Sequence, residues 1–360
     1  MQEDNCARLC EAIRALPRKN ERVRLMEVCG THTMAIAKHG LRGLLPPNVE
    51  LLSGPGCPVC VSAAGQIDAC LSLCEIPDLI LCSYGDMLRV PGSKRGESLL
   101  RKKAEGADVR MVFSPMDALA IAKENRQKKL VFLGVGFETT APGTAAAIQS
   151  AAQSGVDNFF VFSLLKRVEP ALRTLAASPD FAVDGLLCPG HVASITGSEG
   201  FAFVAEELGL PAVIAGFEAE DILLAVWRLL LQHSEGISRL ENMYRRAVRP
   251  EGNMLARRRM DEVFLPSRAI WRGLGEIEGG GLSLRREYAA MDAEKRFSLA
   301  LPTAEPPTAC RCGEILRGVC APADCPLFGG ECTPRDPVGP CMVSSEGACA
   351  AAYQYGTERL

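Results

Sequence analysis

The stretch LVFLGVGFETTAPGTAAAIQSAAQS, residues 130–154, contains the three features that decide the fold. An apolar, β-branched run comes first, at 130–135, and a loop of small and polar residues follows it. The last part, 145–154, is rich in alanine and compatible with a helix. An apolar run that leads through such a loop into a helix is typical of a βα unit. The sequence therefore predicts a strand and a helix here.

The same order recurs from about residue 20 to residue 235. The apolar runs lie at 23–28, 49–52, 78–82, 109–113, 130–135, 159–164, 185–188 and 212–215. Strands that alternate with helices form βαβ units and parallel sheets, so the predicted fold class is α/β. Eight strands can close into one barrel. Two parallel-sheet α/β domains that flank a cleft fit typical domain sizes as well, and we favour them.

The chain divides into three expected parts. The polar run KENRQKK, 123–129, predicts a break between the sheets near residues 125–129. We therefore expect a first α/β domain at 1–125, a second at 126–240, and linker helices with a small cysteine-rich domain at 241–360. A proline-rich linker, LPTAEPPTAC, precedes the cysteine-rich end.

Composition excludes several classes of protein. The 360 residues carry a net charge of −3, which gives no electrostatic case for nucleic acid or an anionic membrane. No apolar stretch reaches the roughly 18 residues of a membrane span. The first residues lack the basic and apolar regions of a secretory signal, so we expect a cytoplasmic location. Sixteen cysteines in a reducing compartment then suggest metal or redox chemistry more than structural disulfides.

Unusual residues follow five of the predicted strands. They are CGTHT at 29–33, GPGCPVC at 54–60, SYGD at 83–86, GFETT at 136–140 and CPGH at 188–191. Ligands bind beyond the carboxyl ends of parallel strands, so these loops predict one cleft between the two domains.

CGTHT and GPGCPVC carry the strongest chemistry of these loops. Cys29 and His32 together suit a borderline-soft metal such as iron or zinc, although a buried thiol with a capping histidine is an equal alternative. Cys57 and Cys60 have the spacing of a redox dithiol or of half a metal site. Since the chain has no second C-x-x-C, we favour the dithiol over metal ligands and over inert thiols.

The remaining loops give weaker signals. GVGFETTAPGT, 134–144, completes neither a P-loop nor a dinucleotide fingerprint, but Glu138 can position a partner or substrate. His191 in CPGH and Asp86 in SYGD are supporting candidates or structural residues.

Seven cysteines lie in the last 51 residues, and such density predicts a metal-organised module. They are Cys310, Cys312, Cys320, Cys325, Cys332, Cys341 and Cys349. Four thiolates can hold a [4Fe–4S] cluster, and structural zinc is the main alternative.

Together, EVCGTHTMAIAKHGL, LLSGPGCPVCV, GFETTAPGTA, CPGHVASITG and the cysteine pattern closely resemble the HypD family of [NiFe]-hydrogenase maturation factors over nearly the whole chain. The resemblance implies a scaffold with redox capacity that assembles the Fe(CN)2CO unit. The implied scaffold binds iron together with HypC and receives cyanide from HypE. HypE makes the cyanide from carbamoyl groups supplied by HypF. The implied fold has two α/β domains and a third that carries a [4Fe–4S] cluster.

The resemblance also assigns roles to residues of this sequence. It puts iron on Cys29 with His32 beside it, and thiol–disulfide chemistry on Cys57 and Cys60. The cluster pattern falls on Cys310, Cys325, Cys332 and Cys349, with Cys312 or Cys341 as the fallback ligand.

Two other classes of function stay open from the residues alone. One is an iron–sulfur thiol/disulfide oxidoreductase that acts on another protein or a small substrate. The other is a zinc-stabilised interaction protein in which CPVC is an ordinary turn.

Overall fold

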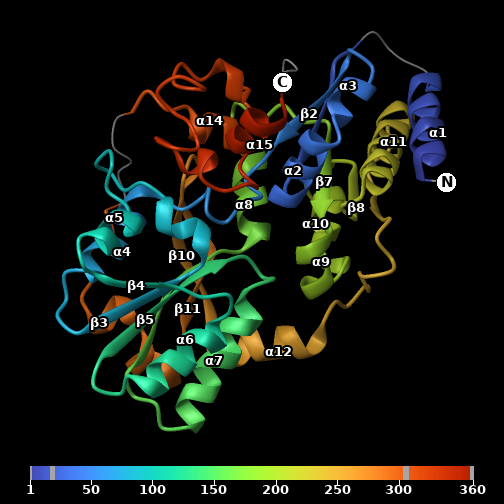
Figure 1. The fold of residues 1–360 in the computed structure, drawn as a ribbon. Helices are drawn as coiled ribbons and strands as arrows, with labels where there is room; N and C mark the ends of the chain where they lie inside the picture. The colour runs from blue at the N-terminus through green and yellow to red at the C-terminus, as the bar shows by residue number, and fades with distance from the viewer. Residues whose placement is uncertain (1, 17–20, 303–307, 357–360) are drawn as a thin grey trace.

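Two parallel β-sheets form the frame of the protein in the computed structural model, which describes residues 2–16, 21–302 and 308–356 (Figure 1). The five-stranded sheet has the order β2-β1-β7-β8-β9, and the four-stranded sheet has the order β4-β3-β5-β6. Every strand pair within these two sheets is parallel. The predicted α/β class with two parallel sheets is confirmed.

All eight predicted strands are present. They are β1 Val23–Glu27, β2 Val49–Ser53, β3 Leu79–Ser83, β4 Asp108–Met111, β5 Lys129–Gly136, β6 Phe159–Leu165, β7 Gly185–Pro189 and β8 Ala212–Ala215. A ninth short strand, β9 Leu240–Asn242, extends the larger sheet beside β8. An antiparallel hairpin, β10 Phe264–Trp271 and β11 Gly275–Leu284, follows them.

The strands are shared between the sheets differently from the prediction. The chain forms β1 and β2 in the larger sheet, builds the whole smaller sheet with β3 to β6, and then returns with β7. The expected break at 125–129 lies just before β5, which pairs with β3 in the same sheet. Because β7 pairs with β1 across some 160 residues, the sheets do not follow the expected division into 1–125 and 126–240.

Helices cover the outer face of each sheet. In the larger sheet, apolar side chains such as Leu25, Leu187 and Val213 pack against helices α1, α2 and α11. In the smaller sheet, α6 and α7 pack on Phe132 and its neighbours. The helices of the first two thirds of the chain are α1 Gln2–Ala15, α2 Gly30–Lys38, α3 Leu41–Leu44, α4 Ala64–Leu73, α5 Leu99–Ala104, α6 Pro115–Glu124, α7 Ala141–Gln153, α8 Val168–Ala176, α9 Gly190–Thr196, α10 Ala202–Glu206 and α11 Ala219–Glu235. The α6 helix begins with a capping box in which Ser114 and Asp117 each accept a backbone N–H.

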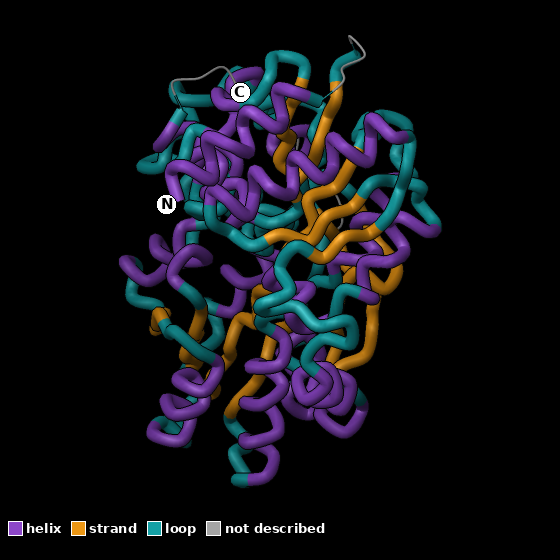
Figure 2. Tube along the Cα trace, turned by 90° about the vertical axis from the view of Figure 1, so that its right-hand side faces the viewer, coloured by secondary structure: helices purple, strands orange, loops and turns teal. Residues whose placement is uncertain are grey.

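A third core joins the sheets to the end of the chain. It contains Leu52 of the larger sheet, Phe162 of the smaller sheet, Trp271 of β10, and several C-terminal cysteines. Seen from the side, the strands form an upper and a lower group, each with helices beside it (Figure 2). The later helices are α12 Met254–Val263, α13 Ala293–Arg296, α14 Cys312–Leu316 and α15 Ala348–Tyr355. The last helix packs against α2, so the cysteine-rich region lies over the loop that follows β1.

The described helices include none with both the length and the hydropathy needed to cross a membrane.

Candidate metal centre and its disulfide

Cys29 lies where β1 ends and α2 begins. Cys29 is 8% exposed and occupies the N-cap position of α2. Burial and, to a smaller extent, the nearby Glu346 and Glu27 carboxylates raise the pKa of its thiol to about 12. The backbone amides of His32 and Thr31 act in the opposite direction. The thiol is therefore protonated without a metal, and a bound cation has to displace that proton.

His32 presents an unpartnered nitrogen close to this thiol in sequence. The side chain is fully buried, and its Nε2 lies 2.8 Å from the carbonyl oxygen of Gly216. A carbonyl only accepts hydrogen bonds, so Nε2 carries the proton. Burial lowers the pKa of the ring to about 4, which keeps it neutral. Nδ1 is buried without a hydrogen-bond partner, and such a lone pair suits a metal ion.

An aromatic stack connects His32 with His191. Phe217 lies between the two imidazoles, with ring centroids 4.7 Å from His32 and 3.8 Å from His191. His191, at the start of α9, is exposed. Both predicted histidines thus stack on the same ring, that of Phe217, but only His32 is buried.

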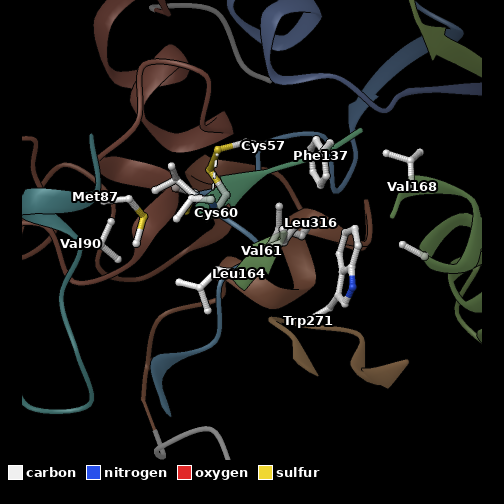
Figure 3. Packing of buried hydrophobic residues seen from close by; sticks show 14 of the residues in the cluster. Cys57, Cys60, Val61, Met87, Val90, Phe137, Leu164, Val168, Trp271 and Leu316 are labelled. Atoms are coloured by element: carbon white, nitrogen blue, oxygen red, sulfur yellow. Dashed lines mark hydrogen bonds between the residues drawn. A yellow bond between two sulfur atoms is a disulfide. The ribbon is translucent and has the colours of Figure 1, made fainter. Parts of the chain in front are cut away.

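The GPGCPVC loop packs directly on Cys29. The amide of Gly30 donates to the carbonyl oxygen of Gly56 over 2.9 Å, and a β-carbon at Gly56 would overlap the backbone of Cys29. Cys57 and Cys60 are joined by a disulfide, which lies among apolar side chains such as Val61 and Met87 (Figure 3). Both cysteines are almost fully buried. The arrangement places a two-electron couple beside the loop of the candidate metal ligand.

Two carboxylates that the motifs did not indicate also lie at Cys29. Glu27 is buried, accepts the backbone N–H of Cys29 over 3.0 Å, and has a pKa raised by burial to about 8. Glu346, from the cysteine-rich region, accepts the hydroxyl of Thr31 over 2.7 Å. Glu27 could have been suspected as the buried acid that ends a strand before CGTHT. Glu346 gives no signal in the sequence.

The SYGD loop reaches the same group through the C-terminal region. Ser344 donates its hydroxyl to Asp86 over 2.8 Å, and the amide of Glu346 donates to that hydroxyl over 3.3 Å. Asp86 is therefore connected to Glu346, and through it to Thr31 beside Cys29.

Glu138 has different neighbours. Its Oε1 accepts the backbone N–H of Val168 over 3.0 Å, and it lines a cavity bounded by α8, α9 and α12. The preceding Phe137 stacks on Trp271, with ring centroids 5.8 Å apart, in the same core as the disulfide (Figure 3). No described hydrogen bond or ion pair connects Glu138 with Cys29.

The C-terminal cysteines lie close to one another. The Sγ atoms of Cys341 and Cys349 are 3.2 Å apart, and a β-carbon at Gly339 would lie 2.7 Å from Sγ of Cys310. The amide of Val338 donates to Sγ of Cys332 over 3.3 Å, a contact typical of iron–sulfur ligands. Cys320 has Arg311 as its main charged neighbour. The structure thus brings Cys312 and Cys341 to the four predicted ligands, Cys310, Cys325, Cys332 and Cys349.

Within residues 2–16, 21–302 and 308–356, no group of three or more His, Cys, Asp or Glu side chains is already arranged to hold a metal ion. The ligand assignments therefore stay predictions. By donor chemistry, the thiols fit an iron–sulfur cluster, and the thiol–imidazole pair of α2 fits a single iron.

Taken together, these features define an α/β protein with a buried thiol and a buried imidazole at one helix start, an adjacent disulfide and a cysteine-rich C-terminal region. A family model described as "HypD: Hydrogenase formation hypA family" matches residues 4–356. Hydrogenase maturation factor HypD2 of Bradyrhizobium diazoefficiens is 48% identical over 358 residues, 98% of this chain and 94% of the relative. Hydrogenase maturation factor HypD of Escherichia coli is 49% identical over 334 residues, 92% and 89% of the two chains.

A third relative, hydrogenase maturation factor HypD of Cupriavidus necator, is 46% identical over 356 residues, 97% of this chain and 94% of the relative. The chain belongs to the HypD family of hydrogenase maturation factors. The predicted family is confirmed.

Proposed function

We propose that this protein is the scaffold on which the Fe(CN)2CO unit of [NiFe]-hydrogenase is assembled. The observation that carries the proposal is that the Cys29 thiol and the unpartnered Nδ1 of His32 are both buried within the first turn of one helix, α2. Iron is the cargo here. Cys29 binds it as a thiolate after losing its proton, and the neutral His32 is available as a second ligand without losing one.

The surroundings of Cys29 support a thiolate that carries a metal. The Glu346 carboxylate lies near the sulfur and favours a bound cation over a free thiolate, whereas Glu27, with its pKa raised to about 8, is mostly protonated at neutral pH. Glu27 also fixes the backbone at Cys29, since it accepts the amide of that residue and the hydroxyl of Thr33. Burial excludes water, which otherwise competes for iron.

The Cys57–Cys60 pair supplies the redox capacity of the site. Formation of the disulfide from two thiols releases two electrons and two protons, and its reduction takes up the same number. The direct packing of Gly56 on Cys29 supports a role at the iron. A [4Fe–4S] cluster held by Cys310, Cys325, Cys332 and Cys349 would supply one-electron transfer.

The partners proposed from the family resemblance are HypC, which shares the iron, and HypE, which delivers cyanide made with HypF. We propose that these steps take place in the cytoplasm. The nearly complete burial of Cys57 and Cys60 favours this scaffold over a free-standing thiol/disulfide oxidoreductase, because such an enzyme has to expose a sulfur to its substrate.

Infrared spectroscopy of the protein, co-purified anaerobically with HypC, tests the proposal. We expect cyanide and carbonyl stretching bands in the wild-type complex and their loss in Cys29→Ala. Cys320→Ser is the matched control, since this cysteine lies in the C-terminal region beside Arg311, and it should retain the bands. Bands of full intensity in Cys29→Ala would overturn the iron assignment.

A further inference from the structure

Glu138 leaves one carboxylate oxygen without a partner at the wall of a cavity. The residue is 6% exposed, and its Oε1 accepts the backbone N–H of Val168. Its Oε2 is also buried and has no hydrogen-bond partner. A buried carboxylate oxygen without a donor is unfavourable, so a ligand that donates to it gains an interaction that the protein itself does not provide.

The arginines that line the cavity already have oxygen partners. Arg167 donates to the carbonyl oxygen of Gly279 over 3.1 Å and lies 3.8 Å from the Glu169 carboxylate. Arg257 donates to the carbonyl oxygen of Glu251 over 2.8 Å. Burial raises the pKa of Glu138 to about 7, and attraction by Arg167 offsets this only in part. Glu169 and Asp261 add two further acidic groups, so the cavity favours a cation over an anion.

The cavity is small, and about half of its lining is apolar. Its volume is about 240 Å³, below the roughly 300–1,000 Å³ of sites for drug-sized ligands. The apolar lining comes from α9, the turn after it, α12 and the β10–β11 hairpin, and includes Val192, Ile195, Phe201, Met260, Phe264 and Leu282. Such walls accept a short hydrocarbon chain.

We propose that this cavity binds a primary ammonium group on a short aliphatic chain, with the ammonium donating to Oε2 of Glu138 and the methylenes packed on the apolar walls. A free aliphatic amine and the lysine side chain of a partner protein share this chemistry. The helix α8 follows a strand of the smaller sheet, and α9 follows a strand of the larger one. The bound group therefore lies between helices that follow strands of different sheets, and Cys29 is not part of the cavity lining.

Calorimetric titration of the full-length protein with n-butylammonium chloride at pH 8 tests the proposal. We expect saturable binding to the wild type and at least tenfold weaker binding to Glu138→Gln, which keeps the size of the side chain. Glu199→Gln is the matched control, because this exposed residue lies next to the lining residue Gly200 but does not line the cavity, and it should change the affinity less than twofold. Sodium n-butyrate should not bind.

A second variant keeps the test valid if Glu138→Gln folds poorly. Met260→Trp enlarges a half-buried side chain of α12 in the cavity wall and should abolish binding while leaving Glu138 intact. Equal binding by Glu138→Gln, or preferential binding of butyrate, would overturn the proposal. The lysine analogue Nα-acetyl-lysine N-methylamide separates the two sources: if it displaces n-butylammonium, a partner's lysine is the occupant, and if it does not, a free amine is.

Discussion

Gly56 lies against the backbone of Cys29, and its carbonyl oxygen accepts the amide of Gly30 over 2.9 Å. The disulfide loop and the candidate iron ligand are thus one packed unit. A methyl group at Gly56 would overlap the backbone N and Cα of Cys29, and neither atom can move without shifting the start of α2.

Gly56→Ala should therefore lower the free energy of unfolding by about 1–3 kcal/mol, the usual cost of overpacking. It should also reduce the infrared bands of the HypC complex. Urea unfolding followed by circular dichroism gives the stability. Gly330→Ala is the control, because a β-carbon there meets open space, and it should stay within about 0.5 kcal/mol of the wild type. Equal effects of the two substitutions would contradict the packing argument.

His32→Phe should remove iron from Cys29 more than it disturbs the fold. Phenylalanine keeps the stacking on Phe217 but has no Nδ1 lone pair, so we expect at least a tenfold loss of infrared band intensity. His191→Phe keeps the stacking on the other face of Phe217 and should retain the bands. If both variants lose the bands equally, or if both retain them, the Nδ1 lone pair of His32 is not what holds the iron.

The sequence alone predicts some parts of this site and not others. The alternation of apolar runs and helices located β1 and β2, and with them the adjacency of CGTHT and GPGCPVC at neighbouring strand ends. It did not determine which strands share a sheet, because the pairing of Leu25 with Gly185 depends on contacts far apart in the chain. A run such as 185–188 satisfies the same pattern in either sheet.

The contacts around Cys29 show the same limit. Glu346 reaches Thr31 only because the cysteine-rich region packs over α2, and no local pattern in SSEG indicates this. Phe217 follows β8 in a stretch that resembles ordinary core sequence, yet its ring separates the two histidines. Motifs located the thiols and imidazoles, whereas their neighbours came from tertiary packing.

Glu138 should make stability depend on pH in a defined window. Its pKa is raised from 4.5 to about 7 by burial, so the folded protein holds this proton more tightly than the unfolded chain does. The stabilising effect of the protonated carboxyl is complete below pH 4.5 and is lost as the pH rises through 7. Glu138→Gln removes this titration. The difference in unfolding free energy, variant minus wild type, should rise by roughly 3 kcal/mol between pH 4.5 and 8. If the difference in unfolding free energy between variant and wild type stays constant from pH 4.5 to 8, Glu138 is not the group that titrates.

Serine substitutions can assign the cluster ligands. Cys349→Ser should lose the visible absorption and most of the roughly four irons expected for a [4Fe–4S] cluster, whereas Cys320→Ser should keep them. Anaerobic iron analysis and absorption spectra measure both. Since Cys341 lies 3.2 Å from Cys349, loss of iron in Cys341→Ser but not in Cys349→Ser would transfer the ligand role to Cys341.

Cys57→Ser should separate the redox function from the cluster. The disulfide with Cys60 cannot form in this variant, while the C-terminal cysteines stay unchanged. We expect hydrogenase maturation to be abolished in cells that carry it, with the cluster's visible absorption intact, because in the proposed function the pair supplies electrons at Cys29 and is not a ligand of iron. Serine is close to cysteine in size, so the packing of the loop on Cys29 is kept.

Val59→Ala, between the two cysteines, is the control for the loop, since it shortens a buried side chain and leaves both sulfurs in place. Loss of the visible absorption in Cys57→Ser would mean that the pair is structural or binds metal, and full maturation would mean that the electrons reach Cys29 by another route.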